Sequence, residues 1–420
     1  MSANACWPAV MLCVVVACAD NGNEEVHGGG TIIPWNSRLV IVDADTIVAA
    51  SVGLSSVELL DIGGSTVGST AIEPDAEQAI PSTCADRAPM SLALVTPTRT
   101  GRATLVVQDP CGVWIAERNA TGDFAPLRSA ELEEIGPSLY VEVFPDGRRL
   151  ALGNDPYVAI VALMDVREPA DLQLAGGQLH HRVSHMMRFQ PAVNGEGPST
   201  LLAQRHAAIE VIRISEDNSI QTDAVLLQEV SPPYTKPFDA FEHFTVLPGQ
   251  GCPSIAVGIG LFDRSAGNVP RRLQMLELDI ENAETRSRDL TGTDGVRGIV
   301  ALQAPDGLQY SHFLSVLGES EAGHYFSVYG LEACSDWALL ATSDVEFSIQ
   351  TPPTPGWGEV KRVPESVFVS LVGQISDGRE LEIYHYDGYD LRILTAGIDD
   401  WSIRERTVAL HASRTDLSIR

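Results

Sequence analysis

The chain of 420 residues is long enough to bury a large hydrophobic core. Its 44% hydrophobic and 20% charged residues exclude an intrinsically disordered protein. With 28 Lys and Arg against 56 Asp and Glu, the net charge is −28. A chain of this charge repels phosphate backbones, so nucleic acid is excluded as an expected partner.

The N-terminus reads as an export signal. Met1–Ala17 contains no charged side chain, and Ala9–Ala19 is an unbroken apolar run. The run is shorter than the roughly 20 residues that span a membrane, and it suits the apolar core of a signal peptide. It ends in Val15-Val16-Ala17-Cys18, which resembles the lipobox of bacterial lipoproteins. The alternative is a buried strand or a short helix.

The resemblance implies that residues 1–17 are removed and that Cys18 is lipidated. Residues 18–36 continue with a polar, Gly-rich stretch that suits a flexible tether. The expected location is the bacterial cell envelope, as an outer-membrane lipoprotein facing the periplasm or the surface. The membrane is therefore one expected partner, reached through the lipid.

From residue 37 to residue 420 the pattern predicts an all-β domain. Short runs of Val, Ile, Leu and aromatic residues alternate with polar residues and end at Gly, Pro, Asp or Asn. One regular strand recurs about every fifty residues, at Val57–Ile62, Val113–Glu117, Val158–Leu163, Ile209–Ile214, Leu273–Leu278, Phe326–Leu331 and Leu381–Tyr386. This period predicts a single β-propeller of about seven four-stranded antiparallel blades.

Strands A to D are counted from the propeller axis outward. The recurring strand is expected to be strand C in every blade, and strand B precedes it. Ile403–Leu410 is left over after the seventh unit and is expected to close the ring as a returning strand.

Three segments resemble known propeller repeats. Ala103–Leu127 and Arg148–Leu163 are similar to FG-GAP/VCBS repeats of integrin-α-like propellers, and Phe144–Leu152 (FPDGRRLAL) resembles TolB-type or WD40-like repeats. The resemblance implies the propeller fold. The chain lacks the D-x-D-x-D-G calcium loop of such repeats, and Asp43-Ala44-Asp45 is the nearest fragment.

No catalytic motif stands out, and no catalytic residue or cofactor is predicted. Nucleophile elbows, zincin helices, phosphate loops and dinucleotide fingerprints are absent from the sequence. The densest histidine cluster, at His180, His181 and His185, is a weak candidate for metal binding. The alternative for these three residues is a polar loop.

Two proline-rich segments are candidates for a recognition surface. Ser231–Phe244 and Thr351–Pro364 combine stiffening prolines with aromatic residues, which give contact area at small entropic cost. The alternating strand order predicts that both connect strand D to the next strand A, on the face that also carries the B–C insertion Gly260–Arg271. The candidate binding residues are Tyr234, Phe238, Phe241, His243 and Trp357. The alternative is that these loops pack down on the blades.

Excluding Cys6, Cys13 and Cys18 leaves four cysteines, which are expected to form disulfides. Cys84 falls in a D–A connection and Cys111 in a B–C turn, whereas Cys252 falls in an A–B turn and Cys334 in a C–D turn. The D–A and B–C links share one face, and the A–B and C–D turns share the other. The pairing that never crosses between faces is Cys84–Cys111 with Cys252–Cys334.

The sequence favours an envelope-anchored binding or interaction module for a protein or a glycan. An envelope scaffold subunit is not distinguished from it. The alternative is a propeller hydrolase, of lactonase or glycosidase type, whose carboxylates converge on the central channel.

Overall fold

The structure of the protein is a computed structural model. It describes residues 39–50, 57–64, 68–76, 91–97, 101–109, 112–130, 132, 140–154, 157–164, 171–179, 187–190, 199–205, 208–227, 241–247, 255–260, 272–279, 284–294, 296–320, 322–332, 336–345, 370–386 and 390–409. The chain divides into the units Met1–Ile32 and Ile33–Arg420, and every described residue belongs to the second unit. Within these ranges no helix is long and apolar enough to cross a membrane.

The described strands form seven four-stranded sheets. Sheet 1 contains β1 (Leu39–Asp43), β2 (Thr46–Ala50), β3 (Val57–Asp61) and β4 (Gly68–Ile72). Sheet 2 contains β5 (Ser91–Val95), β6 (Thr104–Asp109), β7 (Gly112–Glu117) and β8 (Arg128–Ser129). Sheet 3 contains β9 (Tyr140–Val143), β10 (Arg149–Asn154), β11 (Tyr157–Met164) and β12 (Asp171–Leu179). Sheet 4 contains β13 (Met187–Gln190), β14 (Ser199–Arg205), β15 (Ala208–Ile214) and β16 (Ile220–Leu227).

The three remaining sheets follow the same plan. Sheet 5 contains β17 (Phe241–Val246), β18 (Ile255–Gly260), β19 (Arg272–Asp279) and β20 (Glu284–Asp294). Sheet 6 contains β21 (Val296–Gln303), β22 (His312–Ser320), β23 (Gly323–Glu332) and β24 (Asp336–Val345). Sheet 7 contains β25 (Ser370–Ser376), β26 (Glu380–Tyr386), β27 (Asp390–Gly397) and β28 (Ile403–Ala409).

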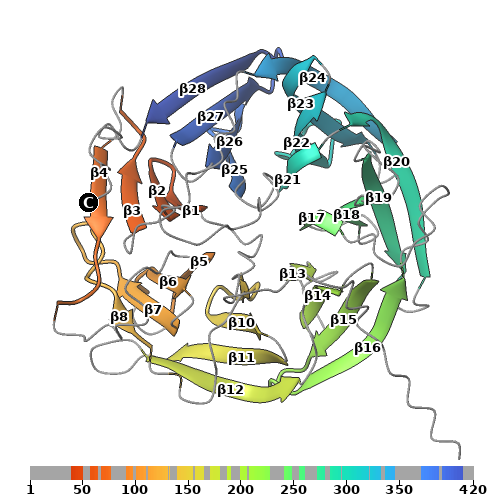
Figure 1. Cartoon of the computed structure of the whole chain (residues 1–420). Coiled ribbons are helices and arrows are strands. Elements are labelled where there is room, and N and C mark those ends of the chain that lie inside the picture. Colours follow the sequence, from red (N-terminus) through yellow and green to blue (C-terminus); the bar gives the residue numbers. More distant parts are fainter. Residues whose placement is uncertain are drawn as a thin grey trace, which may run out of the picture. The chain divides into compact units, whose positions relative to one another are not determined.

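Each sheet is antiparallel and takes its strands in sequence order, which makes the fold a β-propeller. The first strand of each sheet contacts the first strand of the next, in the cycle β1, β5, β9, β13, β17, β21, β25 and back to β1 (Figure 1). These first strands are the A strands. The predicted all-β propeller of four-stranded antiparallel sheets is confirmed.

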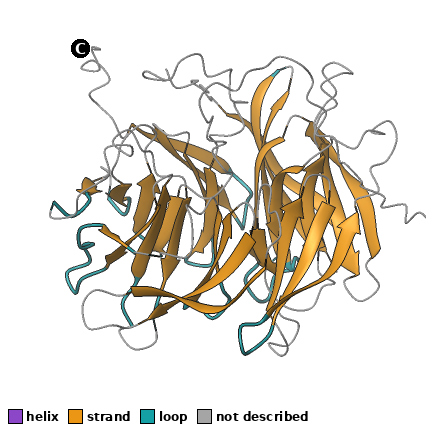
Figure 2. Cartoon of the chain, turned by 60° about the horizontal axis from the view of Figure 1, so that its bottom comes forward, coloured by secondary structure: helices purple, strands orange, loops and turns teal. Residues whose placement is uncertain are grey.

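The alternating strand direction sorts the loops onto two faces. A–B and C–D turns lie on one face, called here the A–B face, and B–C turns and the connections between sheets lie on the other, called the D–A face. Most of the described turns, teal in Figure 2, gather at one end of the strands. Those between β1 and β2, β3 and β4, and β9 and β10 belong to the A–B face.

The strands read as apolar runs because both faces of a sheet are covered by neighbouring sheets. In β2, Val48 packs in the apolar cluster between sheets 1 and 2, whereas Ile47 and Ala49 pack between sheets 7 and 1. All three side chains are fully buried. A half-exposed sheet would show alternation between apolar and polar residues, but a propeller sheet needs apolar residues at successive positions.

Hydrogen bonds on the A–B face connect neighbouring sheets. The backbone N–H of Thr96, after β5, donates to Gly147 O in the A–B turn of sheet 3, at 2.7 Å. Arg149 of β10 donates to the side chain of Asn218 in the C–D turn of sheet 4, and Asn218 Nδ2 donates to Ala175 O in β12, at 3.0 Å. Asn218 has a positive φ of 64°, which asparagine tolerates better than most residues. Sheets 2 to 4 are thus joined by polar contacts as well as by their apolar clusters.

The prediction for the last sheet is wrong by one strand. Leu381–Tyr386 lies in β26, the second strand of sheet 7, and not in the third as expected. Ile403–Ala409 is β28, the outer strand of the same sheet, so it does not return to close the ring. The shift arises because the first strand of sheet 7 begins only at Ser370, later in the chain than the repeat pattern predicts. The expected strand C is the third strand in the other six sheets.

The seam between sheets 7 and 1 predicts a sensitive position. Leu60 is fully buried in that seam, where it packs with Tyr384 and Tyr386 of β26. Leu60→Ala is expected to lower the free energy of unfolding by about 2–5 kcal/mol, because the cavity remains. Leu339→Ala, at a 55% exposed position in β24, is the control and is expected to change it by less than about 0.5 kcal/mol. Equal losses in denaturant titrations would contradict the assignment of Leu60 to this seam.

Candidate functional site

The described residues form an open acidic hollow on the A–B face of sheet 1. Its volume is about 590 Å³, and it is lined by Asp43, Ala44, Asp45, Thr46, Asp61, Gly63 and Gly64. These residues belong to the β1–β2 turn and to the start of the β3–β4 turn. The backbone N–H of Ile62 donates to Asp45 O at 2.8 Å, which joins the two turns. A Cβ at Gly63 would lie 2.7 Å from Asp45 Oδ1, so the close approach requires glycine.

Local hydrogen bonds explain the aspartates of these turns. Asp43 Oδ1 accepts from the backbone N–H of Asp45 at 3.1 Å, and Asp61 Oδ1 accepts from that of Gly63 at 3.2 Å. Aspartate is common at such positions because its short side chain reaches the backbone two residues ahead. Each of these two carboxylates therefore stabilises its own turn.

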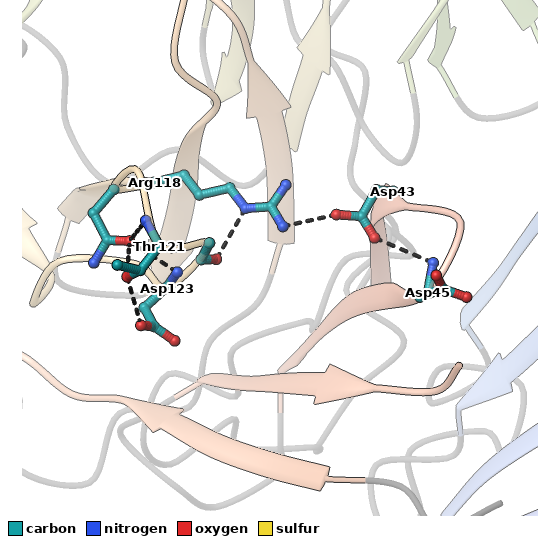
Figure 3. A network of polar contacts seen from close by, with 7 residues as sticks. Asp43, Asp45, Arg118, Thr121 and Asp123 are labelled. Carbon is teal, nitrogen blue, oxygen red and sulfur yellow. Dashed lines mark hydrogen bonds and ion pairs between the residues drawn. The ribbon is translucent and has the colours of Figure 1, made fainter. Parts of the chain in front are cut away.

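A cation from the neighbouring sheet engages the hollow on one side (Figure 3). Arg118, just after β7, places Nη2 2.7 Å from Asp43 Oδ2, and its Nε donates to Gly122 O at 2.9 Å. Burial favours the neutral carboxyl of Asp43, but hydrogen bonds from Arg118, Thr46 and the Asp45 backbone outweigh it, together with the Arg118 charge. They hold the pKa of Asp43 below its ordinary value.

The loop that carries Arg118 is organised by its own side chains. Asn119 Oδ1 accepts from the backbone N–H groups of Thr121 and Asp123, both at 3.0 Å. Thr121 Oγ1 lies 2.6 Å from Asn119 Oδ1 and 2.9 Å from Asp123 Oδ2. These contacts, drawn in Figure 3, set the position from which Arg118 reaches sheet 1.

Sheet 7 engages the same turn from the other side. Gln374 Nε2, in β25, donates to Ala44 O at 3.3 Å and lies 2.8 Å from Tyr384 Oη. Tyr384 Oη donates to Glu382 Oε2 at 2.5 Å. Burial, followed by Glu382 and Asp45, raises the pKa of Tyr384 above its ordinary value, so the phenol stays a hydrogen-bond donor. The hollow is therefore a junction at which sheets 7, 1 and 2 are held together.

The described residues of this junction are not arranged to hold a metal ion. Within the described ranges, no three or more His, Cys, Asp or Glu side chains are grouped so that they could hold a metal ion. Asp43, part of the calcium-loop fragment seen in the sequence, is engaged by Arg118 instead. The hollow can accept hydrogen bonds from a cationic group, but its contacts are those of a structural junction.

Most of the residues singled out from the sequence lie outside the described residues. These are Cys18, Cys84, Cys111, Cys252, Cys334, His180, His181, His185, Tyr234, Phe238 and Trp357. Phe241 and His243 lie in the innermost strand β17, so their expected placement in a loop is wrong, whereas their role as binding residues stays a prediction. Aromatic residues occur both in the proline-rich segment and in the strand FEHFTV that follows it. The sequence therefore gives no clear sign of where the strand begins.

The described strands do locate the ends of the three candidate segments. Residues 228–240 join β16 to β17, residues 261–271 join β18 to β19, and residues 346–369 join β24 to β25. All six flanking strand ends lie on the D–A face, opposite the acidic hollow. The only two lysines of the chain, Lys236 and Lys361, fall in the first and the last of these segments.

Removal of the Arg118 cation predicts a pH-dependent loss of stability. Arg118→Gln is expected to lower the free energy of unfolding at pH 7 by up to about 1 kcal/mol, since the pair is partly exposed. A carboxyl with a depressed folded pKa stabilises the fold above its unfolded pKa and loses that effect as pH falls. The difference between wild type and variant should therefore shrink below about pH 4 in denaturant titrations. A difference that stays constant down to pH 2 would contradict this ion pair.

The cysteine pairing remains a prediction, and the strand order shows on which face the strands before and after each cysteine end. Residues 77–90 and 110–111 link strands on the D–A face, whereas residues 248–254 and 333–335 link strands on the A–B face. The disulfide-linked peptides Cys84–Cys111 and Cys252–Cys334 are therefore expected in peptide maps recorded without reduction. Each disulfide is expected to raise the free energy of unfolding by on the order of 3 kcal/mol. A Cys111–Cys252 peptide, or four free thiols, would refute the pairing.

No protein-family model and no curated protein matches the chain. Among solved structures, a functionally unknown protein from Desulfotomaculum acetoxidans has a TM-score of 0.53 and 11% identity, covering 87% of this chain and 95% of its own. A putative 6-phosphogluconolactonase from Bacteroides uniformis has a TM-score of 0.51 and 11% identity, covering 87% and 97%. The periplasmic gluconolactonase of Pseudomonas aeruginosa has a TM-score of 0.46 and 15% identity, covering 76% and 83%. At these identities the likeness to the first two is one of fold, which is the β-propeller.

Proposed function

We propose that this protein is a propeller-type interaction module that is tethered to a bacterial envelope membrane through Cys18 and binds a protein or a glycan with its D–A face. The observation that carries the proposal is topological. Three segments start and end on that one face. Residues 228–240 and 346–369 are rich in proline and contain aromatic residues, and residues 261–271 form a long insertion between strands B and C. Binding residues concentrate on loops that a rigid scaffold positions.

The composition of these segments fits recognition. Tyr234, Phe238 and Trp357 combine large contact area with few rotatable bonds, and such residues carry much of the energy of many interfaces. By contrast, the described part of the A–B face is occupied by contacts between sheets, such as Arg118 with Asp43 and Gln374 with Ala44. The two faces therefore suit different tasks.

The two lysines allow a test of the binding face. With a protein partner, which has amines of its own, the wild type in membranes treated with an amine-reactive cross-linker is expected to form an adduct through Lys236 or Lys361. Lys236→Arg with Lys361→Arg keeps the charges but removes both amines, so that adduct should disappear. Adding Arg148→Lys to this double variant restores an exposed amine in the A–B turn of sheet 3 and should not restore the adduct.

Two outcomes would refute the binding face. One is an adduct of equal yield through Arg148→Lys, and the other is an unchanged yield when Tyr234, Phe238 and Trp357 are all replaced by alanine. The triple replacement is expected to weaken binding at least tenfold, which corresponds to about 1.4 kcal/mol. The amine of the chain terminus is common to all variants and sets the background.

The tether has its own test. Radiolabelled palmitate should enter the wild type but not Cys18→Ser, because the lipid is attached at Cys18. Cys13→Ser is the matched control, since Cys13 lies in the segment expected to be removed. Labelling of Cys18→Ser at the wild-type level would contradict the lipid anchor.

A propeller lactonase is the second candidate function. It draws on the description of the Bacteroides uniformis neighbour, which at 11% identity is a likeness of fold. Lactonase action would place a carboxylate near the axis, and among the described residues Glu142 of the innermost strand β9 is half-buried. Turnover of lactones that Glu142→Gln abolished would favour this candidate over the interaction module.

A further inference from the structure

The seam between sheets 6 and 7 contains basic side chains within an apolar cluster. Leu381 and Ile383 of β26 and Leu394 and Ala396 of β27 pack in this cluster with residues of sheet 6. His385 follows on the same face of β26, and Arg392 lies directly opposite it in β27. His385 is only 2% exposed and Arg392 only 4%.

The ionisable groups that act on His385, directly or through Arg392, lie on β27, β23 and β28. Arg392 lies on β27 and His324 on β23 of the adjacent sheet. Glu405 of β28 places Oε1 3.8 Å from Arg392 Nη1, and Glu319 of β22 occupies the register position opposite His324. Burial, then Arg392 and His324, lowers the pKa of His385 to about 3. The ring is therefore neutral while the seam is closed.

The two histidines flank the ends of one connection on the D–A face. His324 is the register partner of Val345, the last residue of β24. His385 is the register partner of Leu371, the second residue of β25. Residues 346–369, which include Trp357, join these two strands across the seam. A change in the spacing of sheets 6 and 7 must therefore change the distance between the two anchoring points of this segment.

We propose that the seam between sheets 6 and 7 is an acid-sensitive joint, which opens as His385 takes up a proton from solvent and joins Arg392 and His324 as a third basic group. Opening would move the anchoring points of the segment that carries Trp357. Acid regulation of partner binding follows from the same step, and only this consequence rests on the function proposed above.

The direction of the pH effect follows from proton binding. Above about pH 6.5 His385 is neutral in both the closed and the open seam, so their equilibrium does not depend on pH. Below it, the open seam binds a proton that the closed seam binds only near pH 3. The opening equilibrium should thus rise about tenfold per pH unit, and about 30-fold between pH 7.5 and pH 5.

Amide hydrogen exchange of the full chain tests the joint without any partner. Protection is expressed relative to the unstructured chain at each pH, which removes the intrinsic pH dependence of exchange. In the wild type, protection of β26 should fall about 30-fold from pH 7.5 to pH 5, while that of β6 and β7 stays unchanged. In His385→Gln the fall should be less than threefold, and His385→Leu replaces it if the glutamine variant does not fold.

His312→Gln is the matched control, because His312 is equally buried at 2% exposure in β22 but its Nδ1 lies 3.0 Å from Ser311 Oγ. It should keep the 30-fold loss of protection in β26. An equal loss in His385→Gln would overturn the joint, as would a wild-type loss that extends equally to β6 and β7. Since no partner is present, neither result depends on the binding experiment.

Discussion

The closure of the ring between the first and the last sheet is the constraint on which the rest of the structure depends. Each sheet takes its four strands from one continuous stretch of chain, so no strand is shared between the two ends of the domain. Closure is left to side chains, chiefly an apolar cluster that includes Leu39, Leu60, Tyr384 and Tyr386. Packing of this kind stabilises the ring only if the side chains of the two sheets interdigitate closely.

Polar contacts on the A–B face fix the position of sheet 7 relative to sheet 1. The Ala44 carbonyl accepts from Gln374, and Arg406 of β28 donates to the Gly64 carbonyl at 3.0 Å. On the other side Arg118 engages Asp43. The turn of sheet 1 is thus gripped by both of its neighbours. These contacts between sheets occupy the described part of the A–B face, which is why the proposed recognition surface is placed on the D–A face.

The acidic hollow was only partly visible in the sequence. Asp43 and Asp45 stand out there as a fragment of a calcium loop, but Arg118 lies 75 residues further along the chain. No local pattern reveals that an arginine after β7 will reach the end of β1, because that contact exists only when two sheets stand side by side. The contact makes Asp43 a structural ion-pair partner, a role that the calcium-loop fragment does not reveal.

Strand existence was predictable from sequence, because burial on both faces demands consecutive apolar residues such as those of β2 and β7. The predicted strand order in sheet 7 was wrong, although the sequence contains a signal for the right one. Asp377-Gly378, with positive φ at both residues, follows the first strand of its sheet just as Asp146-Gly147 follows β9. Aligning these Asp-Gly turns would have placed Leu381–Tyr386 second.

The environment of His385 and Arg392 was decided by tertiary structure alone. In the sequence LEIYHYDGYDLRIL, both occupy positions that an isolated hairpin would expose to water. Local sequence can establish which residues share a face of the sheet, since side chains alternate along a strand. Whether that face meets solvent or another sheet depends on the neighbour, because only the approach of sheet 6 removes water from the two basic groups.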